Sequence, residues 1–377
     1  MNDQQICSRC IYDTSIPDIR FDEKGICNFC HVHDTLDKRF PLDDTGKREL
    51  EKLISKIKEE GKNKEYDCIV GVSGGRDSTY TLYLAKKLGL RPLAVHFDNG
   101  WNSETAVSNI KNATNKLGVD LHTVVANWEE FKDLQKAFLR ASVSDAEVPT
   151  DYAIISVLFQ AAAEVGVRYA LNGHSFRTEG LVPKEWTYMD GRYIRSVHKR
   201  FGNLRITSFP IMSLTHLIYY ALIKRITFVQ FLQYFDYRQK EAMELLEREL
   251  DWKFYGGHHH ESVYTNFFQS YFLPTKFNID KRKLEYSALI RSGQMTREAA
   301  LKEVQENPYP YDKEVVRYTI AKLGLNENEF EDIMTAKRKT FRDYPTYYPL
   351  IKASKIPIKI ACTLNLLPDI FYQKYFK

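Results

Sequence analysis

Hydrophobic and polar positions along residues 65–171 follow two alternating patterns. Short apolar runs have the length of buried strands, and the longer segments between them place apolar residues at helical spacing. Ala106, Ile110 and Ala113, for example, share one helix face, and Gly118 follows them as a stop signal. The predicted strands are 66–72, 92–97, 120–126 and 167–171, and the predicted helices are 77–88, 103–117, 129–141 and 150–165.

Repeated strand–helix units predict an α/β fold with a doubly wound parallel sheet, which binds ligands at the carboxyl ends of its strands. A charged helical pattern precedes the sheet, and beyond residue 210 the sequence becomes mainly helical and aromatic. The apolar tract at 214–223 is too short to span a bilayer, so we expect a packed helix there. The predicted units are an N-terminal module at 1–45, a linker helix at 46–64, a sheet domain at 65–210 and a helical substrate or partner region at 211–377.

A glycine-rich loop, Gly-Val-Ser-Gly-Gly-Arg-Asp-Ser, directly follows the first predicted strand. Gly74 and Gly75 permit positive φ angles, and consecutive N–H groups before a helix favour an anion. Asp77 would repel a phosphate unless Mg²⁺ stood between them. The loop lacks the Gly-Lys-Ser/Thr ending of a Walker A sequence, which argues against kinase or GTPase chemistry. The residues expected to hold ATP here are Gly71, Val72, Ser73, Gly74, Gly75, Asp77 and Ser78, with Mg²⁺ on Asp77.

The ends of two further strands are expected to reach the same cleft. Backbone groups of Val95, His96 and Phe97 are positioned to contact adenine, and Asp98 to help hold a cation. After the fourth strand, Gly173 and His174 are expected beside ATP or substrate. Arg177 is expected to neutralise pyrophosphate, and Glu179 to hold Mg²⁺ or accept a proton from an attacking amine.

Two Cys-x2-Cys pairs lie near the N-terminus, at Cys7, Cys10, Cys27 and Cys30. Their spacing fits a closed, structural Zn²⁺ site with four thiolates, although free thiols or disulfides are alternatives. Because such a site needs no further ligand, we expect His31 and His33 at the surface.

Composition agrees with a reducing compartment. The chain has 377 residues and a net charge of +5, which is too modest to establish nucleic-acid binding. The first residues show no secretory signal pattern, so we expect a cytoplasmic protein with about two to three domains.

The helical region carries polar clusters whose roles stay open. The segment Gly256–Ser262 contains three successive histidines and is expected to contact substrate or a partner, with a second metal site as the alternative. Basic residues in this region and upstream suit the diphosphate or carboxylate of an activated acidic sugar. For the basic run at 281–283, a solvent-exposed surface without a ligand is an equally good interpretation. The candidates for substrate binding are Arg195, Lys199, His259, Glu261, Lys281 and Arg282, with Arg192 and Arg200 nearby.

The glycine-rich loop resembles the SGGxDS loop of the ATP pyrophosphatase (PP-loop) superfamily. With the two cysteine pairs and the strings NGHSFRTEG, WKFYGGHHHES, LPTKFNIDKRK and SGQMTREAAL, the chain resembles bacterial N-acetyl sugar amidotransferases, the WbpG/PseA-like family, over most of residues 5–305. The resemblance implies an adenine nucleotide alpha-hydrolase-like fold that uses ATP, Mg²⁺ and Zn²⁺. It also implies conversion of an acetamido group on a nucleotide-linked sugar, UDP-linked or acidic, into an acetamidino group for surface polysaccharide or flagellin glycans.

In that chemistry, the amide oxygen attacks the α-phosphate of ATP, pyrophosphate leaves into the loop, and ammonia then displaces AMP. The residues expected to be catalytic are Ser73, Asp77, Ser78, His174 and Glu179. Neither Cys68 nor Cys362 is a good glutaminase nucleophile. The resemblance therefore implies a separate glutaminase and an ammonia-conducting subunit similar to the pair of histidine biosynthesis, and no nucleic acid.

Two rival interpretations remain. A tRNA-modifying ATP pyrophosphatase would share the loop, although Cys68 is the only cysteine in the sheet domain and thiolation commonly needs more. A non-catalytic nucleotide-binding scaffold is disfavoured by Ser73, Asp77 and Ser78 together.

Overall fold

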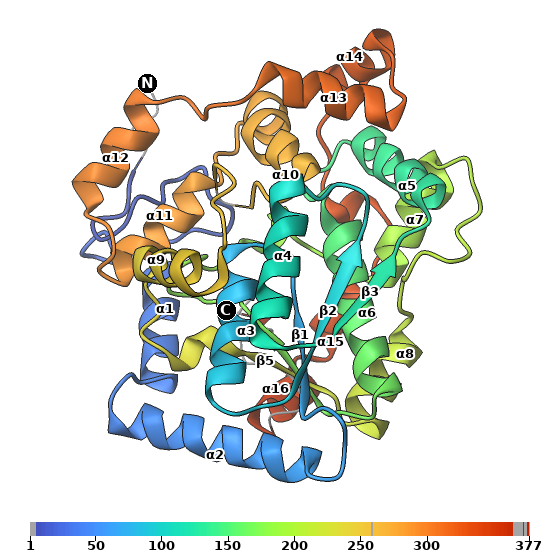
Figure 1. Cartoon of the computed structure of the whole chain (residues 1–377). Helices are drawn as coiled ribbons and strands as arrows, with labels where there is room; N and C mark the ends of the chain where they lie inside the picture. Colours follow the sequence, from blue (N-terminus) through green and yellow to red (C-terminus); the bar gives the residue numbers. More distant parts are fainter. Residues whose placement is uncertain (1–4, 258, 365–371, 373–374, 377) are drawn as a thin grey trace.

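Five parallel strands form the centre of the protein, in the order β3-β2-β1-β4-β5 (Figure 1). The computed structural model describes residues 5–257, 259–364, 372 and 375–376. The order confirms the predicted doubly wound α/β class, because strands are added on both sides of β1. The strands are β1 Cys68–Gly71, β2 Pro92–Asp98, β3 Leu121–Val125, β4 Tyr169–Asn172 and β5 Thr227–Gln230.

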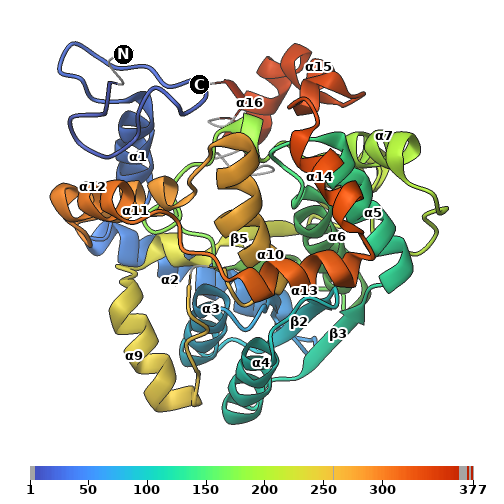
Figure 2. The same cartoon turned by 90° about the horizontal axis from the view of Figure 1, so that it is seen from above.

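Helices cover both faces of this sheet, as Figure 2 shows most plainly. Helices α3 (Arg76–Lys87) and α4 (Glu104–Leu117) lie on one side, and α6 (Val148–Glu164) lies on the other. Local sequence sets the ends of α4, because Ser103 accepts a hydrogen bond from the Ala106 N–H and Gly118 adopts φ +57°. The β-strands and helices predicted between residues 65 and 171 are thus all present, displaced by only a few residues.

The fifth strand comes from the region that the sequence pattern predicts to be helical. Thr227–Gln230 pairs in parallel with Tyr169–Asn172, so the sheet extends beyond residue 210. The strand is only 4 residues long and no regular βα unit leads into it, so periodicity gives little sign of it.

The expectation of a packed helix at 214–223 is confirmed only in part. The segment forms α8 (Leu214–Ile218) and a π-helical turn, η2 (Tyr219–Ile223), and none of its residues is buried. Leu217 and Tyr220 pack against the hydrophobic core, and Tyr220 stacks on Phe159 of α6 at 5.5 Å between ring centroids. Apolarity alone does not establish burial, because a short amphipathic segment can rest on the surface.

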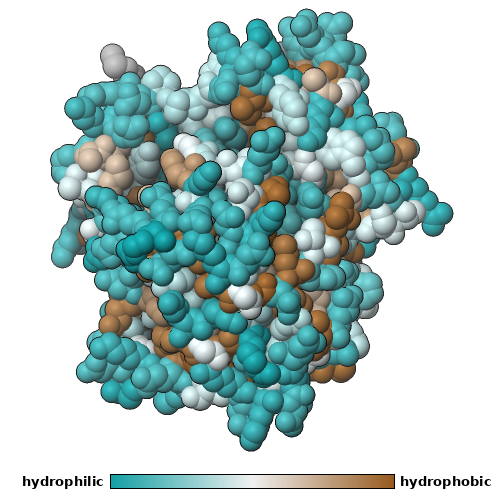
Figure 3. Space-filling model, in the orientation of Figure 1, coloured by the Kyte–Doolittle hydropathy of each residue, from teal (hydrophilic) through white to brown (hydrophobic). Residues whose placement is uncertain are grey.

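The described helices include none that is long and apolar enough to cross a membrane. On the face drawn in Figure 3, hydrophobic side chains form small patches between hydrophilic ones. The other helices are α1 Asn28–Arg39, α2 Asp44–Gly61, α5 Trp128–Ala141, α7 Gly191–Phe201, α9 Gln239–Leu250, α10 Val263–Phe267, α11 Arg282–Arg291, α12 Arg297–Glu306, α13 Lys313–Leu323, α14 Glu327–Thr335, α15 Tyr348–Ala353 and α16 Lys355–Thr363. The π-helical η4 spans Phe268–Phe277, and the 3₁₀ turns are η1 Lys184–Trp186, η3 Phe231–Tyr234 and η5 Phe341–Asp343.

The hydrophobic core joins the N-terminal module to the sheet and to the C-terminal helices. One cluster of buried residues contains Tyr12, Ile69 of β1, Phe138 of α5 and Phe267 of α10. In both views the N-terminal loops lie beside α11 and α12 (Figures 1 and 2). The module is therefore packed as an integral part of the fold.

Candidate active site

The phosphate-binding loop lies between β1 and α3, and its shape depends on Gly74. This residue adopts φ +79°, and a Cβ there would come within 2.2 Å of the Ala106 carbonyl oxygen. Side chains from outside the loop hold Gly74 in place, because its carbonyl accepts hydrogen bonds from Asn109 Nδ2 (3.1 Å) and Trp252 Nε1 (3.0 Å). The glycine is required for the close contact of the loop with α4.

Serine hydroxyls already bind the N–H groups of this loop. The Ser73 N–H donates to Ser78 Oγ (3.1 Å), and the Gly75 N–H donates to Ser73 Oγ (3.2 Å). Since α3 begins directly after Gly75, these groups lie at a helix N-terminus, where the helix dipole favours a negative charge. A phosphate oxygen can replace the hydroxyls as the acceptor.

A cavity of about 450 Å³ opens in front of the loop. It brings together residues from β1, β2, β4, α3, α6, α11 and the segment before α10. Most of the residues proposed from the sequence line it: Gly71, Val72, Ser73, Gly75, Asp77, Ser78, Val95, His96, Phe97, Gly173, His174, Glu179, His259, Glu261 and Lys281.

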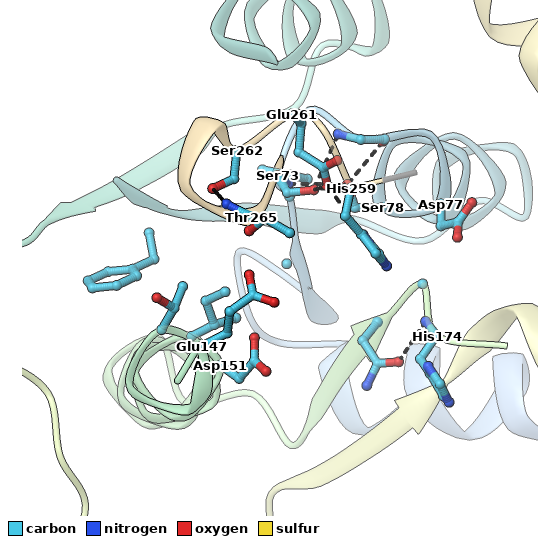
Figure 4. Close-up of a pocket in the computed structure, with 18 of the residues that line it drawn as sticks. Ser73, Asp77, Ser78, Glu147, Asp151, His174, His259, Glu261, Ser262 and Thr265 are labelled. Atoms are coloured by element: carbon cyan, nitrogen blue, oxygen red, sulfur yellow. Dashed lines mark hydrogen bonds and ion pairs between the residues drawn. The ribbon is translucent and has the colours of Figure 1, made fainter. Parts of the chain in front are cut away.

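Asp77 lines the cavity, but its carboxylate points away from the cavity centre in Figure 4. Asp77 Oδ1 accepts hydrogen bonds from Arg76 Nε (2.6 Å) and from the Tyr237 hydroxyl. Tyr237 is fully buried, and burial beside Asp77 raises its pKa well above the ordinary value. In this arrangement one oxygen of Asp77 is occupied by protein groups.

His174 and Glu179 form an ion pair at the end of β4. His174 Nδ1 lies 2.8 Å from Glu179 Oε2. Burial opposes charge on His174, but the Glu179 carboxylate raises the pKa of His174 above its ordinary value. Burial likewise opposes charge on Glu179, yet the same pairing lowers the pKa of Glu179. Both residues line the same cavity as the phosphate loop, as expected from the sequence.

The end of β2 forms the wall expected to contact adenine. His96 Nδ1 lies 2.9 Å from the Val72 carbonyl oxygen, and its Nε2 lies 3.0 Å from Asn102 Nδ2. Burial lowers the pKa of His96, so its imidazole is neutral at pH 7. Asp98 is not among the cavity residues, because its Oδ1 accepts hydrogen bonds from the Gly100 N–H (2.9 Å) and Asn102 Nδ2 (3.3 Å).

Arg177 does not reach the cavity. It is 4% exposed, donates to the carbonyl oxygens of Phe40 (2.7 Å) and Gln233 (2.8 Å), and pairs with Asp37 at 2.8 Å. Its charge therefore joins the N-terminal module to the sheet, and its position does not support the expected contact with pyrophosphate.

Three of the basic residues proposed for substrate binding also lie outside the cavity. Arg282 is buried against Asp280, with Nη2 2.6 Å from Oδ2. Arg195 donates to the Ile211 carbonyl oxygen (2.6 Å), and Lys199 is exposed on α7. Because α7 packs on α5 and α6, on the outside of the sheet, its basic face is separated from the strand ends.

The cavity residues that escaped the sequence reasoning include Glu147 and Asp151 at the start of α6, Tyr255, and Glu285 of α11. The signal for the first two was their four-residue spacing, which places both carboxylates on one helix face. Figure 4 shows them across the cavity from Ser73 and Glu261. Glu147 Oε2 lies 3.4 Å from Lys281 Nζ, so the expected cation at residue 281 is paired with a carboxylate.

The segment before α10 supplies His259 and Glu261, whose Nδ1 and Oε1 atoms lie 3.8 Å apart. Burial would lower the pKa of His259, but Glu261 raises it to about 9. A metal site formed by three successive histidines cannot be placed, since His258 lies outside the described residues.

The cysteines of the N-terminal module form a compact group that can hold Zn²⁺. All four are buried, and their ligand atoms lie within 4.8 Å of one another. The sulfur–sulfur distances of 3.6 Å (Cys27–Cys30), 3.8 Å (Cys10–Cys27) and 3.9 Å (Cys7–Cys30) exceed that of a disulfide. They match the edges of a tetrahedron, about 3.8 Å, expected for Zn–S bonds of about 2.3 Å.

A buried arginine accompanies the cysteine group. Arg291, at the end of α11, donates to Cys10 Sγ (3.2 Å) and Cys30 Sγ (3.3 Å). Its charge compensates part of the negative charge that four thiolates and Zn²⁺ carry. His31 is exposed as expected, whereas His33 is buried: its Nε2 pairs with Asp37 at 3.3 Å, and its ring packs on Phe176.

The sheet order and the loop between β1 and α3 define a PP-loop type of adenine nucleotide fold. Residues 67–153, which include the loop, match the model of the queuosine biosynthesis protein QueC. Residues 261–356 match the model of the C-terminal domain of LPS biosynthesis protein WbpG-like proteins. These matches confirm the resemblance inferred from the motifs. The two matched segments both line the cavity, where Ser73 Oγ of the first lies 3.2 Å from Glu261 Oε1 of the second.

Among curated proteins, an uncharacterized protein of Methanocaldococcus jannaschii is 30% identical over 170 residues. The alignment covers 45% of this chain and 58% of that protein's length.

Solved structures with similar folds include the NH3-dependent NAD synthetase of Campylobacter jejuni (14% identity, TM-score 0.30, covering 78% of this chain and 98% of that chain). Another is a predicted subunit of a tRNA methyltransferase from M. jannaschii (13% identity, TM-score 0.29, covering 47% and 74%). The NMN synthetase of Francisella tularensis is also similar (13% identity, TM-score 0.28, covering 60% and 93%).

Proposed function

We propose that this protein is an ATP-dependent amidotransferase that converts the acetamido group of a nucleotide-linked N-acetyl sugar into an acetamidino group. The observation that carries the proposal is the composition of the cavity, which is lined both by the phosphate loop and by residues of the WbpG-like segment. ATP and an acceptor handled by the WbpG-like segment would meet in that space.

The reaction needs an activated oxygen, since an amide oxygen is a poor leaving group. The acetamido oxygen attacks the α-phosphate of ATP and forms an O–P bond, while the bond to pyrophosphate breaks. Ammonia then adds to the imidate carbon, and AMP leaves with the former amide oxygen. The products are the amidine, AMP and pyrophosphate.

The loop residues suit the first step. The N–H groups of Ser73 and Gly75 and the hydroxyl of Ser78 lie at the start of α3, where they favour the negative charge of leaving pyrophosphate. Mg²⁺ would supply further charge neutralisation on the phosphates, with Asp77 Oδ2 among the oxygens that can hold it.

The pair His174–Glu179 suits the second step. The Glu179 carboxylate lines the cavity and is ionised at neutral pH, so it can accept a proton from ammonia as the C–N bond forms, while its pairing with His174 lowers its pKa and weakens it as a base. His174 holds that carboxylate in position through its 2.8 Å contact.

The acceptor would lie toward α6. This end of the cavity carries carboxylates and hydroxyls, at Glu147, Thr150, Asp151 and Thr187, which can accept hydrogen bonds from sugar hydroxyls. Lys281 is the cavity cation on this side, and its pairing with Glu147 weakens the case for a strongly acidic sugar.

Ammonia would come from a separate glutaminase. Cys68 is fully buried in β1, and burial raises the pKa of its thiol. Burial also raises the pKa of Cys362. Neither thiol has the lowered pKa of an activated nucleophile, and the other cysteines among the described residues form the zinc group.

The test is acceptor-dependent release of pyrophosphate. The full chain is incubated with ATP, Mg²⁺ and ammonium, and with either a panel of UDP-linked acetamido sugars or bulk tRNA. We expect release only with one or more of the sugars, and a product whose mass matches replacement of the amide oxygen by NH. Ser73→Ala provides the matched active-site control and should reduce the release.

Other outcomes would replace the proposal. Release stimulated by tRNA alone would move the protein to RNA modification. ATP binding without release, with every acceptor and with ammonium present, would favour a nucleotide-binding scaffold.

A further inference from the structure

The carboxylate of Glu261 lies within the phosphate loop. Its Oε1 accepts a hydrogen bond from Ser73 Oγ (3.2 Å), and the same atom would lie 2.6 Å from a Cβ at Gly75. Oε2 has no hydrogen-bond partner, and the residue is buried, with only 8% of its surface exposed. A buried carboxylate oxygen without a partner is costly, which indicates that a ligand completes its surroundings.

The main chain on both sides of Glu261 is fixed to the loop between β2 and α4. The Ser103 N–H donates to the Glu261 carbonyl oxygen (2.8 Å), and the Val263 N–H donates to the Trp101 carbonyl oxygen (2.8 Å). Ser262 also forms a β-bridge with Asn102. Glu261 is thus held at the loop by backbone hydrogen bonds, and its position does not depend on its own side-chain contacts.

A fixed carboxylate beside a phosphate-binding loop opposes the entry of pyrophosphate, and His259, whose Nδ1 lies 3.8 Å from Glu261 Oε1, supplies only one positive charge against it. Two adjacent anions repel each other strongly in a partly buried site. A divalent cation between them removes the conflict, and Mg²⁺ is commonly held by one or two carboxylates together with phosphate oxygens.

The surroundings favour this carboxylate over Asp77 as the main ligand. Asp77 Oδ1 is engaged by Arg76 and Tyr237, whereas Glu261 lines the cavity and its Oε2 is buried without a hydrogen-bond partner. Figure 4 shows Glu261 next to Ser73 and Ser78, with Asp77 turned away. Among the described residues, only the cysteine group offers three or more metal ligands, so a Mg²⁺ site here would be completed by phosphate.

We propose that Glu261 is the carboxylate that binds Mg²⁺ on the pyrophosphate portion of ATP. The inference rests on the proposed use of ATP, and it assigns the metal-binding role to a residue of the WbpG-like segment. The nucleotide site would then be built from both matched segments, so that ATP·Mg²⁺ binding depends on the position of the C-terminal part.

The experiment measures ATP affinity by titration calorimetry without acceptor, at Mg²⁺ concentrations from zero to saturation. Glu261→Gln keeps the size of the side chain and removes its charge. We expect this variant to bind metal-free ATP at least as tightly as wild type, while the tightening by Mg²⁺ falls by about tenfold or more. Mn²⁺ replaces Mg²⁺ in a second titration, in which electron paramagnetic resonance reports metal bound to the protein–ATP complex.

Glu314→Gln is the matched control. It removes an exposed carboxylate of the same WbpG-like segment that does not line the cavity, and it should leave the effect of Mg²⁺ on ATP affinity unchanged. Glu261→Asp keeps the charge and should retain part of the Mg²⁺ effect, so it provides the test if the glutamine variant fails to fold.

An equal gain in ATP affinity at every Mg²⁺ concentration in Glu261→Gln would overturn the inference, because Glu261 would then only occupy the empty loop. An unchanged Mg²⁺ effect in either Glu261 variant would overturn it as well. Wild-type protein that binds no ATP would instead contradict the proposed function.

Discussion

Gly74 illustrates how a single residue sets the shape of the site. Gly74 and Gly118 both adopt a positive φ. A Cβ atom added at Gly74 would clash with backbone atoms of Ala106, whereas one added at Gly118 would have no atom within 4 Å. We expect Gly74→Ala to abolish measurable ATP binding and to destabilise the protein by more than the cost of the φ angle alone, about 1–2 kcal/mol.

Gly118→Ala is the matched control for that variant, since nothing lies within 4 Å of its Cβ position. It should cost about 1–2 kcal/mol and leave ATP binding intact. Calorimetric ATP binding and urea denaturation measure the two effects, and equal losses in both variants would contradict the described loop geometry.

His259 gives the site a pH dependence. Its pKa, about 9, lies above the ordinary value of 6.5 because the carboxylates of Glu261, Glu179 and Asp77 outweigh burial. A raised pKa in the folded state stabilises the protein fully below about pH 6.5, and this contribution is lost as the pH rises through about 9.

We therefore expect the difference in unfolding free energy between wild type and His259→Gln to be largest below pH 6.5 and to disappear above pH 9. Urea denaturation at several pH values measures it. A difference that is constant across this range would show that folding does not raise the pKa of His259.

The sequence predicted the position of single residues correctly where neighbouring residues in the chain determine that position. Ser73, Gly75 and Ser78 line the cavity because their loop directly joins a strand to a helix. Arg177 did not follow its expectation, since its partners are Asp37 and the Phe40 and Gln233 carbonyls, far away in sequence. A short motif contains no information about such distant partners.

At the scale of elements, α11 connects the cysteine group of the N-terminal module to the candidate active site. Lys281, which precedes the helix, and Glu285 within it line the cavity, and Arg291 at its end contacts the cysteine group and lies 4.6 Å from the Tyr12 ring centroid. One helix thus contacts both the cysteine group and the wall of the cavity.

We expect Arg291→Met to release zinc faster and to lower stability by about 3 kcal/mol, because it removes one partner from a buried charged group. The measurements are zinc release to a colorimetric chelator and thermal unfolding. Arg248→Met, on an exposed part of α9, should match wild type in both. Equal release rates for Arg291→Met and wild type would show that Arg291 does not interact with the metal-bound thiolates.

The prediction of elements was accurate for the first four strands and failed for β5. The first four belong to regular βα units, whose alternating pattern is visible in the sequence. β5 is defined by its pairing with β4, a contact between residues about sixty positions apart. The same limit applies to 214–223, where apolar composition did not reveal that the segment lies at the surface.

At the scale of the whole molecule, the N-terminal and C-terminal parts complete one another. β5, Trp252 and Glu261 all lie beyond residue 210, and each contacts the sheet or its phosphate loop. We expect a fragment of residues 1–210 to show no cooperative urea transition and no ATP binding. A fragment that folds and binds ATP with wild-type affinity would contradict this account.

The ammonia source can also be tested on the whole chain. We expect substantial amidine formation with ammonium and little or none with glutamine, because the thiols of Cys68 and Cys362 have raised pKa values. Product mass after incubation with each nitrogen donor measures the difference. Equal rates with glutamine and this chain alone would show that it contains its own glutaminase.

The central claim is that the acetamido oxygen is transferred to AMP. The most direct measurement uses a sugar acceptor identified in the pyrophosphate assay, prepared with ¹⁸O in its acetamido group, and mass spectrometry of the AMP formed with ATP, Mg²⁺ and ammonium. The account predicts that the label appears in AMP in step with amidine formation. Unlabelled AMP formed together with the amidine would contradict it.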